Sequence, residues 1–141
     1  MLRRTVLAAA AAAMLTAASP ALLAAPSREV VPYEVSGLKS SAKEIHEAIL
    51  KAVPMRKWGV RSDEPGKVTV IYPTNTRAKQ YQAVVSVTYA DGYFKVDYVS
   101  SRGLNEERGC KDNPNAVCVH RNVNRWIANL GKDIVNLLSM P

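Results

Sequence analysis

The chain has 141 residues, with 19 Lys and Arg against 12 Asp and Glu, and a formal net charge of +7 at pH 7. No block of Lys and Arg with interleaved aromatic residues indicates a nucleic-acid surface, so we expect no nucleic-acid partner. A modestly basic protein favours anionic surfaces such as membrane lipid, cell-wall polymer or an acidic protein patch, although general solubility explains the charge equally simply.

Residues 1–24 have the pattern of a secretory signal peptide. Arg3 and Arg4 precede an apolar run from Val6 to Ala18, and small residues follow. Ser19-Pro20-Ala21 fits the cleavage rule best, while cleavage after Ala24 or Ala25 and an uncleaved anchor are alternatives. The apolar run is too short to span a membrane. We therefore expect a periplasmic or secreted protein with no transmembrane segment after signal removal.

The only two cysteines are Cys110 and Cys118, which close a short loop. In an oxidising compartment, two such cysteines predict a disulfide. The spacing is not C-x-x-C, and only His120 is nearby, so a metal or redox role is the weaker interpretation.

The predicted domain begins after an extended lead-in at residues 25–40 and covers residues 41–141. Ser41-Ala-Lys-Glu44 matches a capping box, and Ile45, Ala48, Ile49, Ala52 and Val53 then follow a helical period. Pro54 is expected to stop or kink this helix, because proline lacks the amide donor and clashes with the preceding turn.

From Trp58 the hydrophobic period changes to two, which predicts an antiparallel meander of four strands. Asp91-Gly92 predicts a two-residue type I′ hairpin between the last two strands. That turn sets a register in which Ala90 faces Tyr93, Tyr89 faces Phe94, Val87 faces Val96, and Val85 faces Tyr98. The opposite face of the sheet is half polar, and it is expected either to face water or to serve a dimer or partner contact.

The segment Cys118–Leu138 predicts a long core helix. Its apolar side chains fall within one arc of about 120° at 100° per residue. This arc contains Val123, Trp126, Ile127, Leu130, Ile134, Leu137 and Leu138. Gly131 lies on one border of the arc, where the first helix is expected to approach. Asn122, Asn129 and Asn136 recur every seven residues on the other border.

Two segments, Ser100–Asn105 and His120–Leu130, carry a resemblance to small exported proteobacterial proteins and lipoproteins of unknown function. Those proteins have a helix, an antiparallel meander and a C-terminal helix opening with H-x-x-Y-N-x-W-I-x-N-L. Here Val123 stands at the Tyr position, and the loop with Cys110 and Cys118 is an addition. The resemblance implies a fold and a compartment but no activity, and a Tyr-dependent site does not carry over.

The candidate ligand or partner site is the polar border around Trp126, formed by Asn122, Asn129 and Asp133. Amides and a carboxylate beside an indole suit a sugar, peptide or other polar ligand. The alternative is a packed Trp with a solvated rim, or an Asn129 that holds the Ser100–Asn105 loop. His120 is a further candidate, with a helix cap or loop anchor as the alternative.

No known catalytic motif is present, and only His46 and His120 supply imidazoles. A trio of Ser100, His120 and Asp133 can be written, but a chain of this size allows such a trio by chance. We expect no catalytic residues, no metal and no cofactor. A basic set, Arg56, Lys57, Arg61, Arg77 and Lys79, predicts either an anion site or ordinary solvated charges.

These features predict an α+β fold in which an N-terminal helix, a four-stranded antiparallel meander and a long C-terminal helix follow one another, with both helices on one sheet face. The expected function is a non-enzymatic binding or interaction module of the cell envelope. Its partner would be an envelope protein or an anionic envelope component. A small envelope hydrolase, or an inhibitor of a periplasmic hydrolase, is the alternative.

Overall fold

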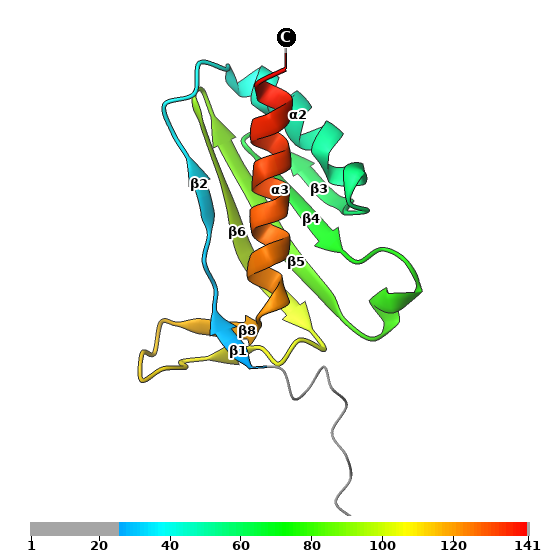
Figure 1. The fold of residues 1–141 in the computed structure, drawn as a ribbon, viewed down its shortest axis with the longest axis vertical. Helices are drawn as coiled ribbons and strands as arrows, with labels where there is room; N and C mark the ends of the chain where they lie inside the picture. Colours follow the sequence, from blue (N-terminus) through cyan, green and yellow to red (C-terminus); the bar gives the residue numbers. More distant parts are fainter. Residues whose placement is uncertain (1–25, 141) are drawn as a thin grey trace, which may run out of the picture.

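The computed structural model describes residues 26–140, so the predicted signal peptide lies outside the described residues. Over these described residues the fold is α+β, with two α-helices and two antiparallel sheets of five and three strands (Figure 1). Neither α-helix of this part is long and apolar enough to cross a membrane.

The five-stranded sheet has the order β2-β6-β5-β4-β3, and the three-stranded sheet at one end of the molecule has the order β1-β8-β7 (Figure 1). The strands are β1 (Ser27–Glu29), β2 (Tyr33–Val35), β3 (Gly59–Glu64), β4 (Lys67–Tyr72), β5 (Gln82–Ala90), β6 (Tyr93–Arg102), β7 (Glu107–Arg108) and β8 (Val117–His120). The helices are α2 (Ala42–Met55) and α3 (Asn122–Leu138), and η1 (Thr76–Lys79) is a short 3₁₀ helix.

The predicted single four-stranded meander is wrong, because the chain builds a wider sheet and a second one. Residues 25–40 supply β2, which pairs antiparallel with β6, and β1, which pairs with β8. Strand β7 completes the small sheet on the other side of β8. Strands of two to four residues are too short to show a hydrophobic period of two, so the sequence pattern did not predict β1, β2, β7 and β8.

The hairpin between β5 and β6 has the predicted register at all four pairs. The predicted type I′ turn is wrong, since that turn needs positive φ at both central residues and only Gly92, at 71°, has it. The turn is instead shaped by the start of α2. Asp91 Oδ1 accepts from the amide of Ala42 at 2.7 Å, and the amide of Gly92 donates to the carbonyl of Ser40 at 2.9 Å.

The capping box of α2 is confirmed. Ser41 Oγ accepts from the amide of Glu44 at 3.2 Å, and Glu44 Oε1 accepts from the amide of Ser41 at 3.1 Å. The helix ends at Met55, one residue after Pro54. Its buried side consists of Ile45, Ala48, Ile49, Ala52 and Val53, which are the side chains that the period predicted.

Helix α3 begins at Asn122, four residues later than predicted, because Val117–His120 is the strand β8. The expected approach of the first helix at Gly131 is also not what the structure shows. A Cβ at Gly131 would lie 2.1 Å from the ring of Tyr33, so the missing side chain makes room for β2. Four residues of the predicted apolar arc are fully buried, namely Val123, Ile127, Leu130 and Ile134. The other three, Trp126, Leu137 and Leu138, are partly buried and pack against the core.

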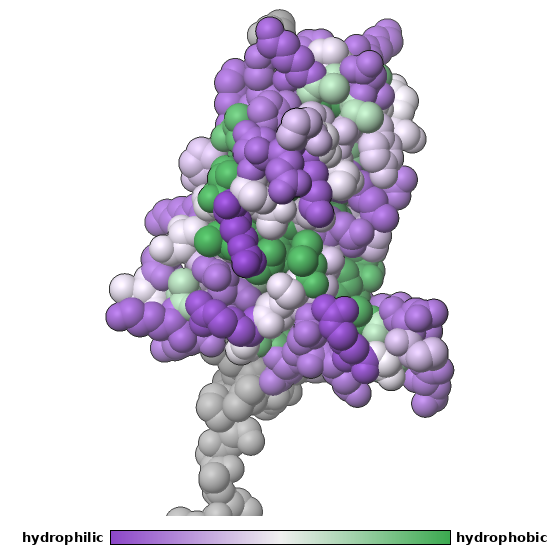
Figure 2. All heavy atoms as spheres, turned by 180° about the vertical axis from the view of Figure 1, so that it is seen from behind, coloured by the Kyte–Doolittle hydropathy of each residue, from purple (hydrophilic) through white to green (hydrophobic). Residues whose placement is uncertain are grey.

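The two faces of the five-stranded sheet differ sharply. One face lies under α2 and α3 (Figure 1), and its central side chains are fully buried. These are Val68, Val70, Val85, Val87, Phe94 and Val96. No helix of the described chain covers the other face, and Figure 2 shows apolar and strongly hydrophilic side chains side by side on it. The term open face is used below for this uncovered side.

The disulfide is confirmed: Cys110 and Cys118 are bonded, with their Cα atoms 6.1 Å apart. It links the loop after β7 to β8, and both cysteines are buried with Ala116 in a small apolar cluster of their own. A disulfide fits a protein that folds in an oxidising compartment.

Candidate functional site

Trp126 belongs to a continuous row of aromatic rings beside the sheet. The ring centroid of Trp126 lies 4.9 Å from that of Tyr72, and Tyr72 lies 5.3 Å from Trp58. On its other side Trp126 stacks on Tyr81, with 6.1 Å between ring centroids and 15° between ring planes. These rings come from α3, the end of β4, the turn before β3 and the segment before β5. Aromatic pairs at such spacings contribute roughly 0.5–1.5 kcal/mol each beyond the area they bury.

A cavity of about 210 Å³ opens beside this row. Trp58, Tyr72 and Trp126 line it together with three polar residues, Arg56, Arg125 and Asn129. We call this the aromatic pocket. Pockets for drug-sized ligands usually measure about 300–1,000 Å³, so this one suits a single ring or a terminal group.

Arg56 follows α2 and is held in place by Asp133 of α3. Its Nε donates to Asp133 Oδ2 at 2.7 Å, and its Nη2 donates to Oδ1 at 3.3 Å. The Asp133 side chain is only 8% exposed, whereas that of Arg56 is 51% exposed. The bond to Asp133 raises the pKa of Arg56. The carboxylate therefore serves to orient a cation and does not itself line the pocket.

The asparagine column is divided by the structure. Asn129 lines the aromatic pocket, whereas Asn122 does not, and Asn136 is exposed. No hydrogen bond from Asn129 to the Ser100–Asn105 segment is present. Asn124, which lies outside the predicted column, has the clearest structural role of the asparagines in this helix. Its Oδ1 accepts from the amide of Val31 at 2.9 Å, and its Nδ2 donates to the carbonyl of Glu29 at 2.9 Å.

His120 lies at the end of β8, apart from the aromatic pocket, and is only 4% exposed. Its Nδ1 accepts from the amide of Asn122 at 3.2 Å, which satisfies one of the free N–H groups at the start of α3. Burial lowers the pKa of His120, and the positive charges of Arg121 and Arg125 lower it further. We therefore interpret His120 as a neutral ring that caps the start of α3 by accepting a backbone hydrogen bond.

The trio of Ser100, His120 and Asp133 is not assembled. Asp133 is bonded to Arg56 and His120 to the amide of Asn122, and neither bonds to the other. Within residues 26–140, no group of three or more His, Cys, Asp or Glu residues is placed to hold a metal ion.

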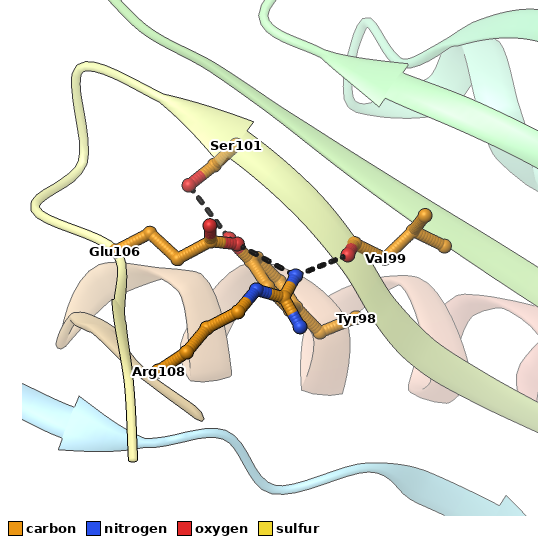
Figure 3. Close-up of polar contacts among 5 residues, drawn as sticks. All are labelled: Tyr98, Val99, Ser101, Glu106 and Arg108. Atoms are coloured by element: carbon orange, nitrogen blue, oxygen red, sulfur yellow. Dashed lines mark hydrogen bonds and ion pairs between the residues drawn. The ribbon is translucent and has the colours of Figure 1, made fainter. Parts of the chain in front are cut away.

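A second polar cluster joins the end of β6 to the segment that leads into β7 (Figure 3). The hydroxyl of Tyr98 donates to Glu106 Oε1 at 2.6 Å and lies 2.7 Å from Ser101 Oγ. Arg108 Nη2 donates to Glu106 Oε1 and to the carbonyl of Val99, each at 3.2 Å. Burial raises the pKa of Tyr98, and the hydrogen bond to Glu106 raises it further.

A phenol with a raised pKa stays protonated at neutral pH, so Tyr98 is poorly suited to act as a base or a nucleophile. The cluster instead fixes the chain where it leaves the large sheet. The hairpin register predicted from the sequence places Tyr98 opposite Val85 but gives its hydroxyl no partner. Glu106 and Arg108, eight and ten residues after Tyr98, belong to no periodic pattern that would have placed them beside its hydroxyl.

Comparisons with protein-family models, with curated proteins and with solved structures find no match to this chain. The aromatic pocket therefore has to be interpreted from its own chemistry.

Proposed function

We propose that this protein is an exported, non-enzymatic binding module of the cell envelope, and that the aromatic pocket receives an anionic group carried on a ring. The periplasm is the compartment expected from the signal-peptide pattern of residues 1–24, and the disulfide agrees with export. The resemblance to small exported proteobacterial proteins points to the same compartment.

The observation that carries this proposal is the arginine held at the edge of an aromatic wall. Asp133 engages Nε and Nη2 of Arg56, and a guanidinium has five N–H donors, so the remaining donors are free for a ligand. A cation already fixed by a buried carboxylate loses little conformational entropy on binding. Arg125, on the exposed side of α3, forms no ion pair with the described residues and adds a second positive charge.

The remaining lining fits the same ligand. Trp58, Tyr72 and Trp126 present ring faces and edges to a planar or apolar moiety, and Asn129 offers an amide donor and acceptor. Arginine pairs with carboxylate or phosphate through parallel hydrogen bonds, which gives direction as well as attraction. A sugar acid or an acidic ring of a wall polymer has both parts.

The test is a titration followed by intrinsic tryptophan fluorescence, with glucuronate, benzoate, glucose and inorganic phosphate as probes. Glucuronate or benzoate should quench or shift the emission at concentrations where glucose has no effect. Arg125→Ala and Asn129→Ala should each weaken binding about 5- to 20-fold, on the order of 1–2 kcal/mol.

Asn122→Ala is the matched control, because Asn122 belongs to the same column but does not line the pocket. Its affinity should equal that of the unmodified protein. Equal affinities of all three variants, or no response to either acidic probe, would contradict the proposed site.

A further inference from the structure

A second hollow, on the open face of the five-stranded sheet, has a volume of about 400 Å³. Ile71 of β4 and Val84 of β5 are paired in register and supply its apolar part. Its other lining residues are Arg61, Gln82, Ser100, Ser101 and Arg102, with no acidic side chain among them. Both helices lie in front of the sheet in Figure 1, and Figure 2 views the molecule from the opposite side.

Two β-bulges flank this hollow. On β3, Val60 pairs with Val70 but Ser62 pairs with Thr69, so Arg61 is the extra residue. On β6, Tyr98 pairs with Val85 but Ser100 pairs with Val84, so Val99 is extra. Val70 pairs with Val85, so both bulges adjoin one continuous row of paired residues across the sheet.

A bulge bends its strand and redirects the neighbouring side chains, and bulges occur often beside functional sites. Here the bulge on the edge strand is centred on Arg61, and the bulge on the opposite flank is followed directly by Ser100–Arg102. All of these residues line the hollow. Two irregularities on separate strands thus converge on the same few residues of an otherwise regular sheet.

Both cations at the hollow are available to a partner. Arg102 Nη2 donates to the carbonyl of Ala78 in η1, which anchors the side chain and leaves its other donors free. Arg61 forms no ion pair with the described residues. The acidic side chain of Asp97, further along the same face, is already paired with Lys95 at 3.5 Å.

We propose that this hollow docks an acidic, extended segment of a partner protein. The carboxylates of the segment would pair with Arg61 and Arg102, and an intervening aliphatic side chain would cover Ile71 and Val84. Side chains at positions i, i+2 and i+4 of an extended segment share one face, so a segment with acidic residues at i and i+4 and an aliphatic residue at i+2 can meet a cationic rim and an apolar floor together. A second copy of the chain fits less well, because a symmetric contact would bring the same two arginines of both copies together.

The experiment measures fluorescence anisotropy of a labelled synthetic peptide with the sequence pattern Glu-Ser-Leu-Ser-Glu, titrated with the full-length protein. The same peptide with Gln in place of each Glu tests the need for charge. The acidic peptide should bind at least tenfold more tightly than the Gln peptide, and its affinity should fall as salt is raised. Free glutamate should compete only weakly.

Arg61→Glu should weaken acidic-peptide binding at least tenfold, and Ile71→Ser about threefold or more. Lys67→Glu is the matched control, with the same charge change on the same strand pair of the sheet but outside the hollow. It should change affinity less than twofold. Trp126→Ala should leave peptide binding unchanged, which separates this site from the aromatic pocket.

Circular dichroism of each variant checks that the fold is retained. We expect Arg61→Glu to fold, because Arg61 is exposed and lies on the edge strand β3. Equal binding by Arg61→Glu and the unmodified protein would overturn the proposal, and so would equal binding of the acidic and Gln peptides. Sedimentation that shows a dimer broken by Arg61→Glu would assign the face to a second copy instead.

Discussion

The two sheets of this protein are stabilised in different ways. The five-stranded sheet is covered by two helices and rests on a broad layer of fully buried Val, Ile, Leu and Phe side chains. The three-stranded sheet contributes only Val119 of β8 to the buried side chains of this core, and it depends more on single bonds. These are the disulfide, the two hydrogen bonds of Asn124 (the asparagine clamp) and the cap that His120 supplies to α3 (the histidine cap). A large buried apolar surface tolerates small changes in side-chain packing, whereas the loss of one disulfide or hydrogen bond removes its whole contribution. The comparison predicts a graded set of mutational effects.

The largest effect is expected in the large sheet, from Phe94→Ala. Phe94 is fully buried and stacks on Tyr33 at 6.2 Å, so truncation leaves a cavity under α3 and loosens β2. We expect a loss of about 3–5 kcal/mol in the free energy of unfolding, measured by urea denaturation. A loss below 1 kcal/mol would mean that the core does not dominate stability in this region.

Removal of the disulfide by a Cys110→Ser, Cys118→Ser double substitution should cost roughly 2–3 kcal/mol, because the unfolded chain gains the freedom of the opened loop. Protection from amide exchange should fall first in β7 and β8 and remain in β5. If protection fell equally in both sheets, the two would form one cooperative unit and the distinction drawn above would fail.

The asparagine clamp should contribute less. Asn124→Ala removes both hydrogen bonds to the β1–β2 connection, and we expect a loss of about 1–2 kcal/mol. Asn122, two residues earlier in the same helix, forms no such bonds. The free energy of unfolding of Asn122→Ala should therefore stay within about 0.5 kcal/mol of the unmodified protein. Thermal denaturation of the pair gives a direct comparison, and equal losses would show that the clamp contributes nothing.

The smallest effect concerns pH. The folded state lowers the pKa of His120 below its ordinary value of 6.5, so the unfolded chain takes up the proton first. Stability supplied by the neutral ring is therefore complete above pH 6.5 and declines as the pH falls toward the folded-state pKa. For one group the slope cannot exceed about 1.4 kcal/mol per pH unit.

Urea denaturation at intervals from pH 7.5 to 5 would measure this slope of stability against pH. The slope should be smaller in His120→Asn, and His46 is kept in both proteins. An identical slope in the variant would assign the pH dependence to other groups.

Sequence reasoning succeeded where the pattern repeated over many residues. The buried side of α2, the core residues of α3 and the β5–β6 register all come from side chains whose spacing is set by a helix or a strand. The capping box and the disulfide were predictable as well, because each is a local pairing of residue types with a known chemistry.

Sequence reasoning failed where the partner lies far along the chain. Nothing in Ser27–Glu29 indicates that its partner is Cys118–His120, and nothing marks Tyr33 as the ring that rests on Gly131. The candidate site shows the same division. Trp126 and Asn129 were identified from one helix, but Arg56, Trp58 and Tyr72 come from other elements and only the fold brings them together.

The pairing of β1 with β8 has a consequence for the order of folding. Ser27 pairs with His120, and Tyr33 of β2 pairs with Val96, so the first strands to be synthesised need partners from the second half of the chain. Contacts this distant in sequence form slowly, because a long loop must close before they are made. The meander, α2 and β2 can associate before β8 is made, whereas β1 stays unpaired until β8 is complete. The first strand of the described residues is thus among the last to become ordered.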